Sequence, residues 1–163
     1  MTPRRLDDPA RLAALRVTGL LDEDPGPAFE RIARLARDLL GVPAAAVSVV
    51  DDRRERVIGQ VGLELPHGSL VEVPVVDSHG AQVILEGRAV VVEDLREHPS
   101  LGALAGLAPS VAVALAAAPV ASPEAHPLGV VCVIDRRPRA WSERDLARLG
   151  DLAELAATEL ELR

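Results

Sequence analysis

The sequence predicts an α+β domain: a central antiparallel sheet of five or six strands, with N- and C-terminal helices on one face and a short helix and loops over the other. Three observations predict it. Apolar residues recur at helical spacing near both chain ends, short β-branched runs fill the middle, and most connections between those runs have hairpin length. The 163 residues, 48% of them hydrophobic, suit one domain over residues 1–163.

Two helices are expected before the first strand. Asp8 stands at an N-cap position, Pro9 suits the first helical position, and the pattern ends near Gly19. The second helix covers residues 29–40, because apolar residues recur there every three or four positions until a glycine follows. Helices therefore precede the sheet.

Short runs rich in valine and alanine are expected to form the strands. They lie at residues 44–51, 56–62, 71–76, 88–95, 110–120 and 128–135. The first two and the last two are expected to pair as hairpins. The valines of residues 88–95 are expected to be buried on both sides.

Three further helices are expected among and after these strands. One covers residues 78–87, and a short one follows a cap at Ser100. The last is long and begins at Ser142, with Asp145 three residues on as a near capping box. Its apolar stripe consists of Leu146, Leu149, Ala153, Ala156 and Leu160. Such a long stripe is typical of a helix that pairs with a second copy, so these residues are the expected dimer helix.

Composition and charge limit the classes of partner and the cellular location that we expect. The formal net charge is −7 and the 18 cationic residues, all arginine, are scattered, so we expect neither nucleic acid nor an anionic membrane as partner. The first residues lack the apolar core of a signal peptide, and the longest apolar run, residues 111–121, is too short to span a bilayer. The single Cys132 suits a reducing compartment, so a cytoplasmic location is expected.

The residue types that carry chemistry are sparse. Phe29 and Trp141 are the only aromatic residues, so a pocket would be lined by aliphatic side chains, which disfavours purine and bilin ligands. The four histidines are isolated from one another and no glycine-rich phosphate loop occurs, so neither a metal nor a cofactor is expected. Cys132 lies in an apolar run without an adjacent base, which indicates that it is a buried core residue rather than a nucleophile.

Asp77, Ser78 and His79 stand side by side, and both a working site and a helix start would explain them. Adjacent side chains point in different directions, whereas a catalytic triad brings distant residues together, so no triad is expected. The favoured interpretation is that Asp77 or Ser78 caps the following helix and His79 lies near its N-terminus.

Three long phrases resemble the GAF family of small-molecule-binding and signalling domains. They are residues 7–52, 78–99 ("SHGAQVILEGRAVVVEDLREHP") and 116–156, which together span most of the chain. The resemblance implies a sheet with terminal helices on one face, a ligand pocket on the other, and frequent dimerisation through the terminal helices. This chain departs from the family at three positions. Two residues after the Ser78 position the family often has a cysteine, whereas this chain has Gly80. At Gln82 and Leu115 the family often has a residue with a ring.

The resemblance implies a pocket with Ser78, His79 and Gln82 as polar contacts and Leu115, Cys132 and Ile134 as apolar lining. We therefore expect a noncatalytic sensory or regulatory domain that binds a small molecule, forms a homodimer and signals to a separate output protein. The alternative is a degenerate domain with a collapsed pocket that acts only in dimerisation or protein interaction. An enzyme using Cys132 and His79 is the weakest interpretation.

Overall fold

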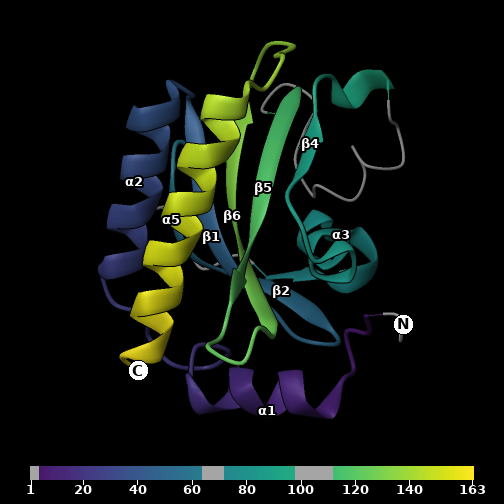
Figure 1. Cartoon of the computed structure of the whole chain (residues 1–163), viewed down its shortest axis with the longest axis vertical. Coiled ribbons are helices and arrows are strands. Elements are labelled where there is room, and N and C mark those ends of the chain that lie inside the picture. The colour runs from purple at the N-terminus through teal and green to yellow at the C-terminus, as the bar shows by residue number, and fades with distance from the viewer. Residues whose placement is uncertain (1–3, 64–71, 98–111) are drawn as a thin grey trace.

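The computed structural model describes residues 4–63, 72–97 and 112–163. Within them the helices are α1 (Pro9–Val17), α2 (Ala28–Leu40), α3 (His79–Glu86) and α5 (Glu143–Glu161). The strands are β1 (Ala44–Val50), β2 (Arg54–Val61), β3 (Glu72–Pro74), β4 (Val90–Val92), β5 (Ala114–Ala121) and β6 (Pro127–Asp135). These strands form one antiparallel sheet in the order β3-β2-β1-β6-β5-β4 (Figure 1). The predicted α+β fold is confirmed, while the short helix expected after Ser100 lies outside the described residues.

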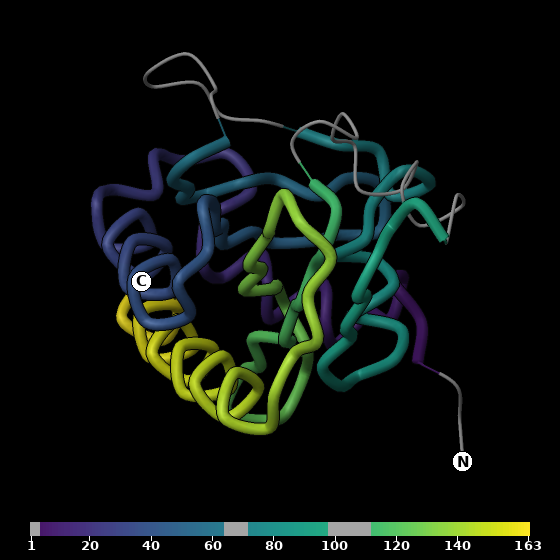
Figure 2. The backbone as a smooth tube through the Cα atoms, turned by 90° about the horizontal axis from the view of Figure 1, so that it is seen from above, coloured from purple at the N-terminus to yellow at the C-terminus, as the bar shows by residue number. Residues whose placement is uncertain are grey.

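The sheet separates two apolar layers. Helices α2 and α5 lie side by side on one face, and α3 lies on the other (Figure 2). Helix α1 crosses the end of the sheet near the start of β6, so α2 and α5, rather than all terminal helices, make up the helical layer (Figure 1). Side chains alternate between the two layers along each strand, which explains why β1 is buried along its whole length.

Helices α2 and α5 are held together at the C-terminal end of α2. Gly41 ends α2 in the left-handed conformation, with φ of 65°. The last carbonyl groups of α2 then accept hydrogen bonds from two arginines of the later chain: Arg139 Nη2 donates to Leu40 O at 2.7 Å and Arg148 Nη1 donates to Leu39 O at 2.8 Å. These bonds satisfy acceptors that a helix end leaves free and fix α5 against α2.

The predicted capping box at the start of α5 is present. Ser142 Oγ accepts from Asp145 N at 3.0 Å, and Asp145 Oδ2 accepts from Ser142 N at 3.1 Å. Burial acts to raise the pKa of Asp145, but the hydrogen bonds from Ser142 and the charge of Arg139 together hold that pKa below its ordinary value. At the start of α1, by contrast, the side chain of Asp8 makes no capping hydrogen bond, although Asp8 does occupy the N-cap position.

Strand β4 is an edge strand, and this corrects one expectation. Val91 is 44% exposed, so the valines of this segment are not all buried on both sides. Among the described strands, β5 is the one that pairs with β4, which places β4 at the edge of the sheet. Its last carbonyl, Val92 O, accepts from Trp141 Nε1 at 3.2 Å, and the guanidinium of Arg139 lies 4.7 Å from the centre of the Trp141 ring. The indole thus joins the end of β4 to the start of α5.

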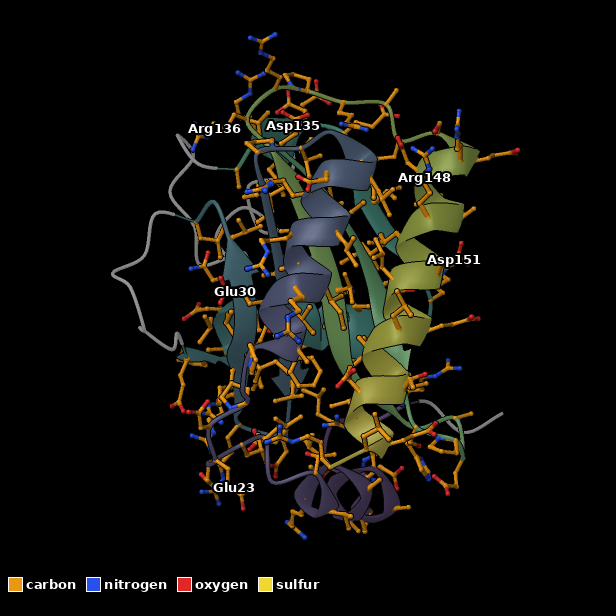
Figure 3. All side chains as sticks on the ribbon, turned by 90° about the vertical axis from the view of Figure 1, so that its left-hand side faces the viewer. Glu23, Glu30, Asp135, Arg136, Arg148 and Asp151 are labelled. Carbon is orange, nitrogen blue, oxygen red and sulfur yellow. The ribbon has the colours of Figure 1, made fainter. Side chains whose placement is uncertain are left out.

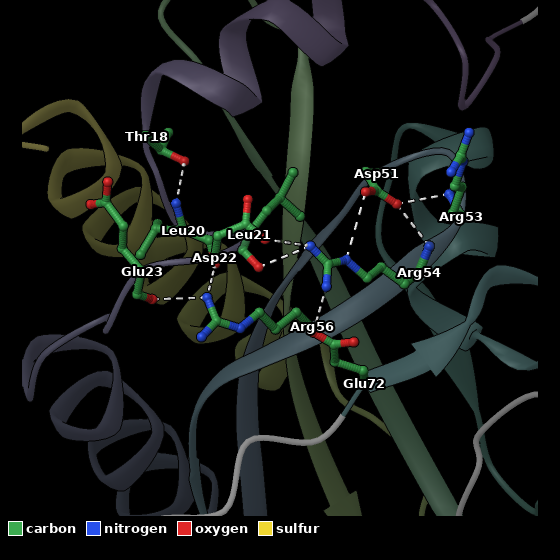
Figure 4. A network of polar contacts seen from close by, with 10 residues as sticks. All are labelled: Thr18, Leu20, Leu21, Asp22, Glu23, Asp51, Arg53, Arg54, Arg56 and Glu72. Carbon is green, nitrogen blue, oxygen red and sulfur yellow. Dashed lines mark hydrogen bonds and ion pairs between the residues drawn. The ribbon is translucent and has the colours of Figure 1, made fainter.

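Arginines of β2 hold the segment between α1 and α2 against the sheet (Figure 4). Arg56 is 5% exposed, and its Nη1 donates to the carbonyl of Leu20 and to that of Glu23 at 2.9 Å. Arg54 Nη2 lies 3.0 Å from both Leu21 O and Asp22 Oδ1, and the hydrogen bond to Asp22 raises the pKa of Arg54. The guanidinium donors replace the water that these carbonyls would lose on burial.

Candidate functional site

The start of helix α3 carries two of the predicted polar contacts. Ser78 is its N-cap, and Ser78 Oγ accepts from Ala81 N at 2.9 Å, which confirms that one of the three adjacent polar residues caps this helix. His79 is the first helical residue. The helix ends at Gly87, whose φ of 67° suits glycine.

A buried carboxylate, Glu55 of β2, lies against the start of α3. Glu55 is 4% exposed, and its two oxygens accept from three donors: Ser48 Oγ at 2.6 Å, Ser78 Oγ at 2.5 Å and Gly80 N at 3.2 Å. These donors, together with the positive end of the helix dipole, offset the cost of burying the charge. We call Ser48, Glu55 and Ser78 the Glu55 cluster. It ties α3 to β1 and β2.

His79 carries an unsatisfied polar atom. Its Nε2 is buried and has no hydrogen-bond partner among the described residues. Leaving a buried donor or acceptor unpaired costs about 1–3 kcal/mol, and such atoms are uncommon in folded proteins. The atom therefore marks a place where an additional polar group would be stabilised.

Gln82, the third predicted polar contact, is bound within its own helix. Its Nε2 lies 3.5 Å from Glu86 Oε1, one turn along, and its side chain is half-buried. The structure thus places Ser78 and His79 at the start of α3 and Gln82 one turn later.

The three predicted apolar residues lie together under α3. Leu115 and Ile134 are Cα partners in the β5–β6 pair, and Cys132 pairs with Ala46 of β1. All three belong to the apolar layer that also contains Val83 of α3, and they are 1–3% exposed. Neighbouring side chains therefore cover them almost completely.

Cys132 is suppressed as a nucleophile. Burial raises the pKa of its thiol well above the ordinary value, and the negative charge of Glu55 acts in the same direction. Because the thiolate is the reactive form, this thiol is inert at neutral pH.

The stripe assigned to a dimer lies in the core of its own chain. Leu149, Ala153, Ala156 and Leu160 are at most 6% exposed and pack against α2 and the sheet, and Leu146 is half-buried. Helical periodicity shows which face of a helix is apolar but not what covers that face. A dimer through the terminal helices has to use other residues of α2 and α5.

Sequence reasoning missed the Glu55 cluster. Glu55 lies in the polar run Asp51–Arg56, which is typical of an exposed turn. The overlooked signal is that Glu55 and Arg56 are consecutive residues of a strand, so they point to opposite faces of a sheet that is covered on both sides.

The described residues contain no group of three or more His, Cys, Asp or Glu side chains placed to bind a metal ion. None of the described helices has both the length and the apolar character that a bilayer-spanning segment needs.

Known proteins resemble this chain in sequence and in fold. A cyclic di-GMP phosphodiesterase of Pseudomonas aeruginosa, PA2567, is 31% identical over 161 residues, which cover 94% of this chain and 26% of that protein. The chain thus spans about a quarter of the length of that relative.

Two solved structures share the fold at low identity. The GAF domain from Acinetobacter phosphoenolpyruvate-protein phosphotransferase superposes with a TM-score of 0.71 at 16% identity, covering 95% of each chain. Free methionine-R-sulfoxide reductase from Neisseria meningitidis gives a TM-score of 0.67 at 21% identity, covering 93% of this chain and 86% of that one. The GAF domain profile matches residues 24–160. The chain therefore belongs to the GAF domain family.

Proposed function

We propose that the chain is a noncatalytic sensory module that binds a small molecule on the α3 side of the sheet and signals to a separate output protein. GAF domains are commonly sensory or regulatory. The observation that carries the proposal is the buried, unpaired Nε2 of His79. A cytoplasmic location, expected from the lone Cys132, belongs to the same proposal.

The surroundings of His79 suit such a contact. The Glu55 cluster fixes the residue before His79 and the residue after it, so the backbone at His79 is held in place without the ligand. Ser78 Oγ already donates to Glu55 and accepts from Ala81, which leaves His79 as the principal polar contact of the three predicted ones. An imidazole nitrogen can take part in a hydrogen bond, so we expect the ligand group that meets it to be a hydroxyl, amide or carbonyl.

The burial of the Cys132 thiol supports a noncatalytic role for this chain. Cys132 is buried and protonated, which removes the nucleophile that the weakest interpretation required. The relative from Pseudomonas aeruginosa is named for a phosphodiesterase activity, and a segment that spans a quarter of it suits a regulatory part. We infer that this chain controls an output in the same way.

Replacing His79 with leucine tests the unpaired nitrogen directly. Removing a buried atom that lacks a partner is expected to raise the free energy of unfolding by about 1 kcal/mol, as measured by urea denaturation. A panel of free amino acids, 2-oxo acids and cyclic nucleotides is then screened by thermal shift. A member that binds wild type is expected to bind His79→Leu about tenfold more weakly and His126→Leu equally well. Equal binding to wild type and His79→Leu, or destabilisation by the leucine, contradicts the proposal.

A second candidate function is interaction alone. It is favoured by the nearly complete burial of Leu115, Cys132 and Ile134, which leaves these side chains covered rather than lining open space. The outward side of the helical layer offers a surface for a second copy: Leu35 of α2 is 47% exposed and Leu155 of α5 is 50% exposed. Figure 3 shows α2 and α5 side by side, with Arg148 and Asp151 of α5 labelled.

Sedimentation velocity tests this candidate. We expect the wild-type protein to be a homodimer, and we expect Leu35→Glu and Leu155→Glu each to dissociate it. Either substitution removes buried apolar area from the interface, at about 25 cal/mol per Å², and adds the free-energy cost of burying a carboxylate. Val76→Glu, at a residue that is 75% exposed outside this layer, is the matched control and leaves the dimer intact. If the wild-type protein sediments as a monomer at high concentration, the proposal of a function through dimerisation is wrong.

A further inference from the structure

Helix α1 has an apolar side that the described residues leave largely uncovered. Arg11 and Leu15 are the buried residues of this helix. A second stripe, formed by Ala10, Ala13, Ala14 and Val17 at spacings of three and four, lies largely in solvent, and Val17 is 79% exposed.

This stripe is one wall of a hollow of about 700 Å³, which we call the α1 groove. The turn between β5 and β6 forms the second wall and the C-terminal end of α5 forms the third. Apolar atoms of Leu128, Ala157 and Leu160 line the groove beside the α1 stripe. The groove lies on the side of the sheet away from α3, so it is separate from the site around His79.

The walls are held in place without an occupant. Arg11 is 2% exposed and anchors α1: its Nη1 donates to Val50 O at 2.6 Å and to Pro127 O at 3.2 Å, and its Nη2 donates to Leu6 O at 2.7 Å. Burial lowers the pKa of Arg11, and nearby carboxylates oppose that shift. The β5–β6 turn is closed by a hydrogen bond from Ser122 N to His126 O at 2.9 Å.

Two free carboxylates stand at this groove. Glu124 comes from the turn and Glu161 from α5, and neither has a hydrogen bond or ion pair within the described part of the chain. Arg163 also lines the groove, but its Nη1 and Nη2 donate to the carbonyls of Pro25 and Asp24 at 2.9 and 3.0 Å. His126 lines the groove as well, with Nδ1 3.9 Å from Asp8 Oδ2.

We propose that the α1 groove binds a small aliphatic amine, with a diamine as the best-fitting member of the class. Volumes of 300–1,000 Å³ with mainly apolar walls and a few polar groups are typical of small-molecule sites. A polymethylene chain matches the alanine and leucine lining, and an ammonium group at each end matches the carboxylates contributed by two different walls. Because this site and the site at His79 share no residue, the inference stands whether or not the proposed function holds.

Four probes of one chain length test the charge argument: 1,6-diaminohexane, hexylamine, hexan-1-ol and hexanoate. Binding is measured by titration of backbone amide shifts in ¹⁵N-labelled protein at low salt. We expect shifts at Ala13, Ala14 and Val17, with affinity falling in the order diamine, amine, alcohol, hexanoate and a dissociation constant for the diamine of roughly 1 mM. Glu124→Gln and Glu161→Gln are each expected to weaken the diamine about two- to fivefold.

Exposed Glu154, which lies outside the groove, provides the control, and Glu154→Gln is expected to change nothing. Ala13→Leu fills the groove from an exposed helical position and is expected to weaken all four probes at least threefold. Equal affinity for the alcohol and the diamine, or diamine shifts that lie on α3 instead, would overturn the proposal.

Discussion

Glu55→Ala is expected to lower the free energy of unfolding by about 3–5 kcal/mol, measured by urea denaturation followed by circular dichroism. The carboxylate accepts from Ser48, Ser78 and Gly80 at a position that is 4% exposed. Alanine removes the acceptor from all three donors, two of which belong to the buried serines Ser48 and Ser78, and each unpaired buried donor costs about 1–3 kcal/mol. The helix α3 also loses its attachment to β2.

Two milder variants separate the hydrogen bonds from the charge. Glu55→Gln keeps an acceptor and adds an amide donor that either serine can accept, so we expect a loss of only about 1 kcal/mol. Ser48→Ala removes one donor while leaving Ser78 and Gly80 bound, and it is expected to cost about 1–2 kcal/mol. If Glu55→Ala unfolds at the same urea concentration as wild type, the Glu55 cluster does not hold α3 in place.

Gly59→Ala is expected to destabilise the fold by about 3 kcal/mol or more, because α2 crosses β2 at this residue with backbone against backbone. A methyl group at Gly59 would meet the backbone carbon of Phe29, lie 2.5 Å from Glu30 N and lie 2.7 Å from Phe29 O. Backbone atoms cannot rotate away as a side-chain tip can, so α2 has to move off the sheet. Thermal unfolding followed by circular dichroism measures the loss.

The matched control is Gly150→Ala in α5, where an added methyl meets no atom within 4 Å. Alanine there is expected to stabilise the protein by about 0.5–1 kcal/mol, because it restricts the unfolded chain and favours the helix. Opposite signs for the same chemical change identify contact with α2, rather than the loss of glycine itself, as the cause. A similar melting temperature for both variants contradicts this account.

The fold was predictable because its signals are local. Ser78 and Ser142 cap helices through bonds to residues three positions on, and the chain between two hairpin strands is short enough to specify their pairing. Residues 7–52 and 116–156 carried the family resemblance for the same reason, since they contain whole helices and strands. Among the described elements, α1 took a different place from the one expected, across the end of the sheet, and β4 lies at the sheet edge instead of being buried on both sides.

The candidate site was less predictable because it depends on contacts between distant segments. Ser78 meets Glu55 across 23 residues, and the polar run that contains Glu55 also contains the exposed neighbours Asp52 and Arg53, so the run as a whole is typical of an exposed turn. Arg11 reaches Pro127 across 116 residues, and a charged residue on a short helix is normally exposed. The burial of the Leu149 stripe likewise depends on α2, which the sheet brings alongside.

Trp141 is an intrinsic fluorescence probe of one defined place in the fold. As the sole indole, bonded to Val92 at the sheet edge and stacked with Arg139, it emits from the junction of β4 and α5 and from nowhere else. Opening of that edge exposes the ring to water and shifts its emission to longer wavelength, while backbone ellipticity follows the whole fold. Transitions that coincide in the two signals mean that the edge strand unfolds together with the core, whereas an earlier fluorescence change means that β4 detaches first.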